Sequence, residues 1–149
     1  LGERQVEMPE REKTGVDLFQ RHPANPLLTA ADFACPVNSV FNAGATSFKG
    51  ETLLLLRVED RRGVSHLTVA TSPDGISNWK LDEKPGLPPD PERHPQEEWG
   101  IEPPRVTYLE EEKSWAVDYA SYHRAGPLVS LATARVSELL AWLEEQSRR

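Results

Sequence analysis

The chain has 149 residues, 28% of them charged, and a formal net charge of −7. That length fits one domain with its own core, and an acidic balance argues against a nucleic-acid-binding protein. No apolar run reaches the roughly 18 residues that a membrane-spanning helix needs, and the polar N-terminus has no signal-peptide core. A single cysteine excludes an internal disulfide. We therefore expect a cytoplasmic protein without nucleic-acid or membrane partners.

The first residues carry no strand or helix pattern. Residues 1–18 are mostly polar, and we interpret them as an exposed N-terminal arm. Pro23 and Pro26 fix φ in the following segment, which is expected to be extended. The chain begins with Leu1 rather than methionine, so we expect a processed product or a fragment.

A first group of apolar runs follows, each ended by turn residues. The continuous run at residues 52–58 predicts a strand buried on both faces, although periodicity alone leaves a helix open. Gly63 and Gly75 mark turns, because glycine accepts a positive φ. We predict one antiparallel sheet of four strands in meander order, at residues 38–48, 52–58, 64–71 and 78–81.

The rest of the chain is predicted to contain a loop, three strands and a helix. Residues 82–98 contain five prolines and several charges, which predicts a long surface loop. Strand patterns return at residues 105–109, 114–121 and 127–133. Residues 134–149 carry an apolar stripe at i, i+3, i+4 and i+7, which predicts a C-terminal helix. The stripe consists of Val136, Leu139, Leu140 and Leu143.

The chain partly repeats itself at a nearly fixed offset. Residues 67–72 resemble residues 129–134, 62 residues later, and Thr46 and Thr107 open corresponding strands at an offset of 61. Small β-sheets at a fixed offset are typical of propeller blades. Chance similarity between apolar strands is the alternative. In the second unit a helix takes the place of a fourth strand.

Six segments of the chain match a known pattern in both sequence and order. They are residues 21–28, 36–45, 56–63, 70–75 followed by Trp79, 99–102, and 126–132. The turn at Asp74 and Gly75 is common to many sugar-active propellers, whereas the six segments together are specific. In this order they resemble glycoside hydrolase family 130, the inverting β-mannoside phosphorylases.

The resemblance implies an all-β fold, a five-bladed β-propeller with a sugar pocket on its axis. On this resemblance, residues 19–149 form an incomplete propeller of about two blades in a truncated copy. Its parts are a first blade at 19–81, a proline-rich loop at 82–98, a second blade at 99–133 and a C-terminal helix at 134–149.

The resemblance also implies a chemistry. Family members cleave β-mannosides, mostly with inorganic phosphate as nucleophile, and release α-mannose 1-phosphate. An inverting reaction needs an acid that protonates the leaving oxygen. The family pattern Trp-Gly-Ile-Glu-Asp-Pro-Arg has that acid where this chain has Pro103, which cannot donate a proton. Its neighbour Glu102 is expected to point to the opposite face of the strand. We therefore expect no intact catalytic residue, and the family's phosphate site is implied to be absent as well.

Five residues match sugar-binding positions of the family and are the candidate substrate-binding set. Asn38 and Ser39 carry groups that pair with sugar hydroxyls, although they also fit a turn before a strand. Arg57 interrupts an apolar run, so it either binds sugar or pairs with a nearby acid, Glu59 or Asp60. The remaining two lie at a predicted hairpin tip, where charges are often only solvated. The set is Asn38, Ser39, Arg57, Asp60 and Arg62.

Two functions stay open. One is phosphorolysis of β-mannosyl-glucose or manno-oligosaccharides, and the other is a non-catalytic remnant that binds sugar weakly or acts as an interaction module. The four histidines show no metal-ligand spacing, so we expect no cofactor besides phosphate as co-substrate. Two blades cannot close a ring, and we expect self-association through open sheet faces. Cys35 is expected to be a small buried residue.

Overall fold

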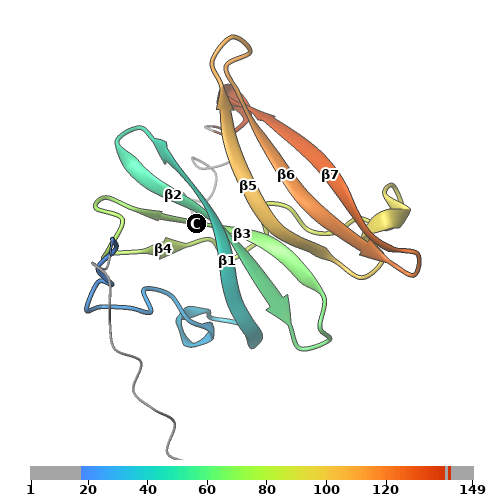
Figure 1. The fold of residues 1–149 in the computed structure, drawn as a ribbon, viewed down its shortest axis with the longest axis horizontal. Helices are drawn as coiled ribbons and strands as arrows, with labels where there is room; N and C mark the ends of the chain where they lie inside the picture. The colour runs from blue at the N-terminus through green and yellow to red at the C-terminus, as the bar shows by residue number, and fades with distance from the viewer. Residues whose placement is uncertain (1–17, 140, 142–149) are drawn as a thin grey trace, which may run out of the picture.

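The computed structural model describes residues 18–139 and residue 141. Within these residues seven strands form two antiparallel sheets, so the expected all-β fold is confirmed (Figure 1). No helix among them is long and apolar enough to cross a membrane. The first sheet has the order β1 (Val37–Phe48), β2 (Glu51–Asp60), β3 (Ser65–Ser72) and β4 (Lys80–Leu81), and the second has the order β5 (Ile101–Leu109), β6 (Ser114–His123) and β7 (Gly126–Arg135).

Each sheet is a meander, which was predicted for the first sheet. Gly63 and Gly75 lie in the turns that flank β3 and have φ values of 80° and 72°, which glycine adopts without strain. The repeated segments, residues 67–72 and 129–134, lie in the third strand of each sheet. β5 is longer than predicted, because it begins at Ile101 rather than at residue 105.

One strand, β2, serves two cores. Its side chains alternate between faces. Leu53 and Leu55 pack between the two sheets, whereas Leu56 and Val58 pack on the opposite face. The apolar run is therefore a strand buried on both faces, and the helical alternative is excluded. The core between the sheets is completed by Leu67, Val69, Ile101 and Tyr119.

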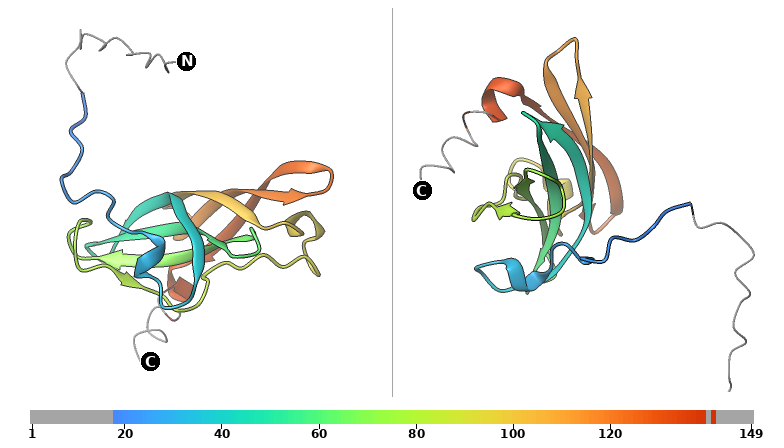
Figure 2. Two further views of the ribbon diagram at one scale, coloured as in Figure 1. Left: turned by 90° about the horizontal axis from the view of Figure 1, so that it is seen from below. Right: turned by 90° about the vertical axis from the view of Figure 1, so that its left-hand side faces the viewer.

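The two sheets meet where β1 passes beside β5 (Figures 1 and 2). The pairing of β1 shifts register between Phe41 and Gly44, and the pairing of β5 shifts between Glu102 and Arg105. A Cβ built on Gly44 would lie 2.9 Å from the carbonyl oxygen of Pro104. Glycine at position 44 is therefore what lets the two backbones approach.

The proline-rich segment 82–98 is a mostly exposed loop that hydrogen bonds attach to both sheets. It contains the 3-10 helix η2 (Pro95–Glu97), and Leu87 pairs with Leu67 through two backbone hydrogen bonds of 3.0 and 3.1 Å. Glu97 is only 3% exposed and accepts a 2.6 Å hydrogen bond from the Tyr119 hydroxyl. Hydrogen bonds therefore attach the loop to both sheets. The composition of the segment did not predict these contacts.

The ends of the described chain bear on three predictions. The exposed arm lies outside the described residues except for residue 18, and most of the predicted C-terminal helix lies outside them as well. Helical structure begins at Val136 rather than at residue 134, because β7 continues to Arg135. Glu138 accepts a 3.0 Å hydrogen bond from the Arg135 backbone N–H, half of a capping box. The described sheets do not close into a ring.

Cys35 is exposed, so its predicted burial is wrong. It lies between the 3-10 helix η1 (Ala30–Asp32) and β1, outside both cores. Phe33 and Val37 on either side of it pack against the core behind the first sheet. The two larger apolar side chains fill that space and leave the thiol outside.

Candidate functional site

Arg57 is the charged residue at the centre of the candidate site. The face of β2 that looks toward the second sheet carries Leu53 and Leu55, then Arg57 and Glu59, so it turns from apolar to polar along the strand. Arg57 is 9% exposed, and a guanidinium in that position needs partners.

The partners of Arg57 come from three other strands. Its Nη2 donates a 2.5 Å hydrogen bond to Glu102 Oε1 on β5, which forms an ion pair between the two sheets. Its Nε donates a 3.0 Å hydrogen bond to Ser65 Oγ on β3. Its Cζ lies 4.2 Å from the centre of the Phe41 ring on β1, a cation–π geometry.

A second acid extends this cluster to the start of β1. Glu59 Oε2 lies 3.9 Å from Arg57 Nη2, and Glu59 Oε1 accepts a 2.5 Å hydrogen bond from Asn38 Nδ2. Ser39 lies opposite Glu59 in the register of β1 and β2. Asn38, Arg57, Glu59 and Glu102 therefore form one polar network, which we call the Arg57 cluster.

Of the predicted site residues, Asp60 and Arg62 do not join the Arg57 cluster, and Ser39 is placed beside it only by its backbone pairing with Glu59. Asp60 Oδ2 accepts a 2.9 Å hydrogen bond from Arg62 Nε, and Asp60 Oδ1 accepts from the backbone N–H of Arg62 and of Val64. Burial acts to raise the pKa of Asp60, but the hydrogen bonds from Arg62 and Val64 hold that pKa below its usual value. These two residues shape the turn between β2 and β3.

Pro103 lies beside the cluster, at an exposed position on β5. It lines a cleft of about 550 Å³ whose walls are the irregular stretches of β1 and β5, including Asn42, Gly44 and Arg105. Its neighbour Glu102 points to Arg57, and that hydrogen bond occupies its Oε1. The cleft is therefore lined by a proline at position 103, and the adjacent carboxylate of Glu102 is held by Arg57.

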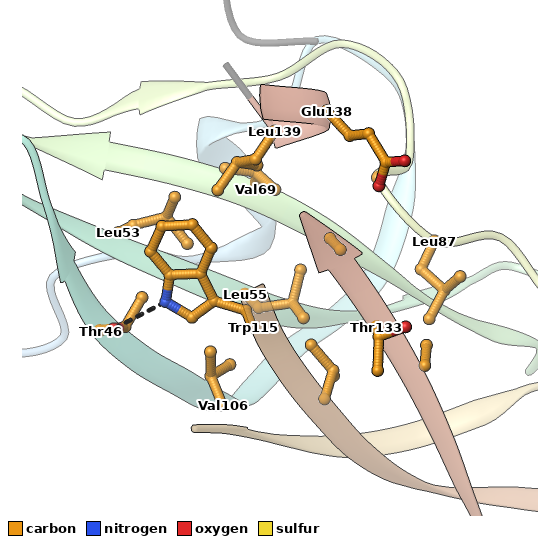
Figure 3. Close-up of a pocket in the computed structure, with 14 residues that line it drawn as sticks. Thr46, Leu53, Leu55, Val69, Leu87, Val106, Trp115, Thr133, Glu138 and Leu139 are labelled. Atoms are coloured by element: carbon orange, nitrogen blue, oxygen red, sulfur yellow. Dashed lines mark hydrogen bonds between the residues drawn. The ribbon is translucent and has the colours of Figure 1, made fainter. Parts of the chain in front are cut away.

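A separate cavity lies between the sheets (Figure 3). It measures about 340 Å³ and is lined by apolar side chains such as Leu53, Val69 and Leu139. Its few polar groups include Thr46 Oγ1, which accepts a 3.4 Å hydrogen bond from Trp115 Nε1. Sugar hydroxyls need polar partners, so this cavity is a gap in packing rather than a sugar site.

Three aromatic residues, Tyr119, Tyr122 and Trp99, lie outside the Arg57 cluster. Tyr119 is buried and its pKa is raised to about 12, first by burial and then by the hydrogen bond to Glu97. Tyr122 lies on the opposite face of β6, as alternation predicts. Trp99 is 54% exposed and packs in neither core. No group of three or more His, Cys, Asp or Glu among the described residues is placed to hold a metal.

Four contacts of the site were not predicted from the sequence. Phe41 and Ser65 were not expected to contact Arg57, Glu59 was not expected to bind Asn38, and Glu102 was not expected to bind Arg57. The register of an antiparallel pair places Phe41 opposite Arg57, and alternation places Glu59 on the same face. Alternation along β2 was visible in the sequence, whereas the register shift between Phe41 and Gly44 that brings Phe41 opposite Arg57 was not. The contact with Glu102 required knowledge of how the sheets pack.

The fold of the two meanders also occurs in solved glycoside hydrolases. A glycosyl hydrolase from Bacteroides ovatus is 28% identical to this chain, with a TM-score of 0.68 over 79% of this chain and 38% of that one. No family model matches the chain, and a search of curated proteins found no match.

A second solved structure similar to this chain comes from the GH130 family of mannoside phosphorylases. That family contains glycoside hydrolases that target β-1,2 mannosidic linkages in Candida mannan. It is 30% identical to this chain, with a TM-score of 0.68 over 89% of this chain and 41% of that one. A β-1,2-mannobiose phosphorylase from Listeria innocua, in complex with β-1,2-mannobiose, shares the fold at 23% identity and a TM-score of 0.67, over 77% of this chain and 47% of that one. The resemblance to glycoside hydrolase family 130 is confirmed, and the chain spans 38% to 47% of the length of these three structures.

Proposed function

We propose that this protein is a family 130 relative that binds a β-mannoside weakly at the Arg57 cluster and does not cleave it. The observation that carries the proposal is that Pro103 lines the cleft beside the Arg57 cluster, and the family resemblance implies that the catalytic acid would stand at this position. The proposal includes the architecture: the two sheets correspond to about two blades of a five-bladed propeller.

The absence of cleavage follows from proton transfer. An inverting glycosidase or phosphorylase protonates the leaving oxygen with a positioned acid. Proline has no proton to give, and the carboxylate of Glu102 already accepts a hydrogen bond from Arg57. Phosphorolysis of a β-mannoside with inorganic phosphate would be the activity of an intact relative, and this chain lacks the group that would start it.

The weakness of binding follows from the cluster itself. Three donor groups of the cluster, Arg57 Nε, Arg57 Nη2 and Asn38 Nδ2, already donate to Ser65, Glu102 and Glu59. A sugar hydroxyl that binds these groups must exchange with existing hydrogen bonds, which lowers the net gain. We expect a dissociation constant in the millimolar range, because affinity depends on enclosure and on polar groups that are free to converge on the ligand.

The compartment is part of the proposal. Cys35 is the single cysteine and its thiol is exposed, which suits a reducing compartment such as the cytoplasm. Mass spectrometry of protein isolated under alkylating conditions would test this placement. A free, alkylated Cys35 supports it, and an oxidised or disulfide-linked Cys35 contradicts it.

The experiment that tests the lack of cleavage is a phosphorolysis assay with mannobiose and with β-mannosyl-glucose. The purified chain should release no mannose 1-phosphate above a protein-free blank. Pro103→Asp alone should not restore release, because the family's phosphate-binding residues are implied to lie in parts of the propeller outside this chain. Clear turnover by the unmodified chain would refute the proposal.

A further inference from the structure

Strand β7 presents a long free edge. It is the last strand in the order β5-β6-β7, and no described strand pairs with its outer side. Residues 126–134 include no charged residue, although 28% of the whole chain is charged. Val129 and Leu131 are 88% and 67% exposed. Natural edge strands are normally protected by charges, bulges or prolines along their length, and this edge has a proline only near its beginning.

We propose that a second copy of this chain pairs with β7, antiparallel to it, about a two-fold axis near Ser130. The pairing joins the two three-stranded sheets into one continuous sheet of six strands. It goes beyond the sugar site, because no residue of the Arg57 cluster takes part.

β7 is complementary to itself, which favours a second copy of the chain as its partner. A two-fold axis at Ser130 places Val129 opposite Leu131 of the other copy and Leu128 opposite Ala132. Apolar side chains then meet apolar side chains on both faces of the joined sheet, which stabilises cross-strand pairs. Because the same patch is used by both copies, the interface closes at a dimer.

Charge also favours this edge. Each molecule carries a net charge of −7, so two copies repel one another over most of their surfaces. An uncharged strand lowers this repulsion along its own length. The nearest charged residues, Arg124 and Arg135, lie beyond the two ends of the uncharged run.

The dimer should be weak. One pair of strands buries less than the roughly 1,200–2,000 Å² of a stable interface. We expect dissociation in the range of tens to hundreds of micromolar. Sedimentation velocity between about 5 and 500 μM should therefore show a shift from monomer to dimer.

Three substitutions make the test specific. Val129→Lys and Thr133→Lys each place a charge on an exposed position of β7, and each should keep the protein monomeric at the highest concentration. Leu18→Lys is the matched control, because Leu18 is 84% exposed but lies outside the sheets. It should dimerise like the unmodified chain. Circular dichroism shows whether each variant is folded. If Val129→Lys does not fold, Thr133→Lys provides the test.

Each possible outcome decides the matter. A dimer that is lost in the β7 variants and kept in the control supports the proposal. A monomer at all concentrations overturns it, and so does a dimer that persists in both β7 variants. Assembly that grows beyond the dimer contradicts a two-fold interface.

Discussion

The ion pair between Arg57 and Glu102 should hold the two sheets together, and Glu102→Gln tests this. The two side chains are 11% and 24% exposed, and the pair joins β2 to β5. Removing one partner of a fully buried pair costs about 3–5 kcal/mol, because the other charge is left without compensation. Glu102 keeps some contact with water, and Glu59 is still 3.9 Å from Arg57. We therefore expect a smaller loss, about 1–2 kcal/mol.

Urea and thermal unfolding measure that loss. For a chain of this size, a change of 1 kcal/mol shifts the melting temperature by roughly 3–4 °C. Glu102→Gln should therefore melt about 3–8 °C lower, as followed by tryptophan fluorescence, to which the buried Trp115 contributes. Glu111→Gln is the control: it removes the same charge from an exposed hairpin tip and should change stability by less than about 0.5 kcal/mol.

A double-mutant cycle separates the pair from its surroundings. Arg57→Met and Glu102→Gln should each destabilise the protein, and the double variant should be more stable than the sum of the two losses predicts. Equal melting temperatures for Glu102→Gln and Glu111→Gln would refute the reasoning, because the ion pair would then contribute nothing to the packing of the sheets.

Two further predictions concern stability. Gly44→Ala should cost about 1–3 kcal/mol in urea unfolding, because its Cβ would meet the carbonyl oxygen of Pro104 at 2.9 Å; an unchanged midpoint would contradict the close approach of β1 and β5. Burial raises the pKa of Asp82 from 3.8 to about 6 in the folded protein, so its charged form is disfavoured there and stability from this group is lost as the pH rises from about 4 to 7. Asp82→Asn should therefore gain stability relative to the unmodified chain across that pH range, and a constant difference between the two unfolding curves would count against it.

The strand order was predictable because its signals are local. The run at residues 52–58 is apolar throughout, and Gly63 and Gly75 lie at turns that need a positive φ. Both the alternation of a strand and the chemistry of a turn are set by residues a few positions apart. The repeat at an offset of 62 residues also pointed to two sheets of equivalent order.

The site was only partly predictable because its contacts are distant in sequence. Glu102 lies 45 residues from Arg57, so only the packing of the two sheets brings them together. Nearness in sequence predicted Glu59 or Asp60 as the partner of Arg57. Glu59 lies on the same face of β2 and contributes, whereas Asp60 is bound to Arg62 in the turn. The burial of Glu97 against Tyr119 was missed for the same reason, since 22 residues separate them.

The central claim is that the Arg57 cluster binds a β-mannoside, and an NMR titration of the isotope-labelled chain with mannobiose tests it most directly. The account predicts millimolar binding, with shifts in the Asn38 side-chain amide and the Arg57 Nε–H, and loss of those shifts in Arg57→Met. Arg93→Met is the control, because its side chain is 83% exposed in the proline-rich loop, and it should bind as the unmodified chain does. No shift at about 100 mM sugar, or shifts confined to residues away from the cluster, would contradict the account.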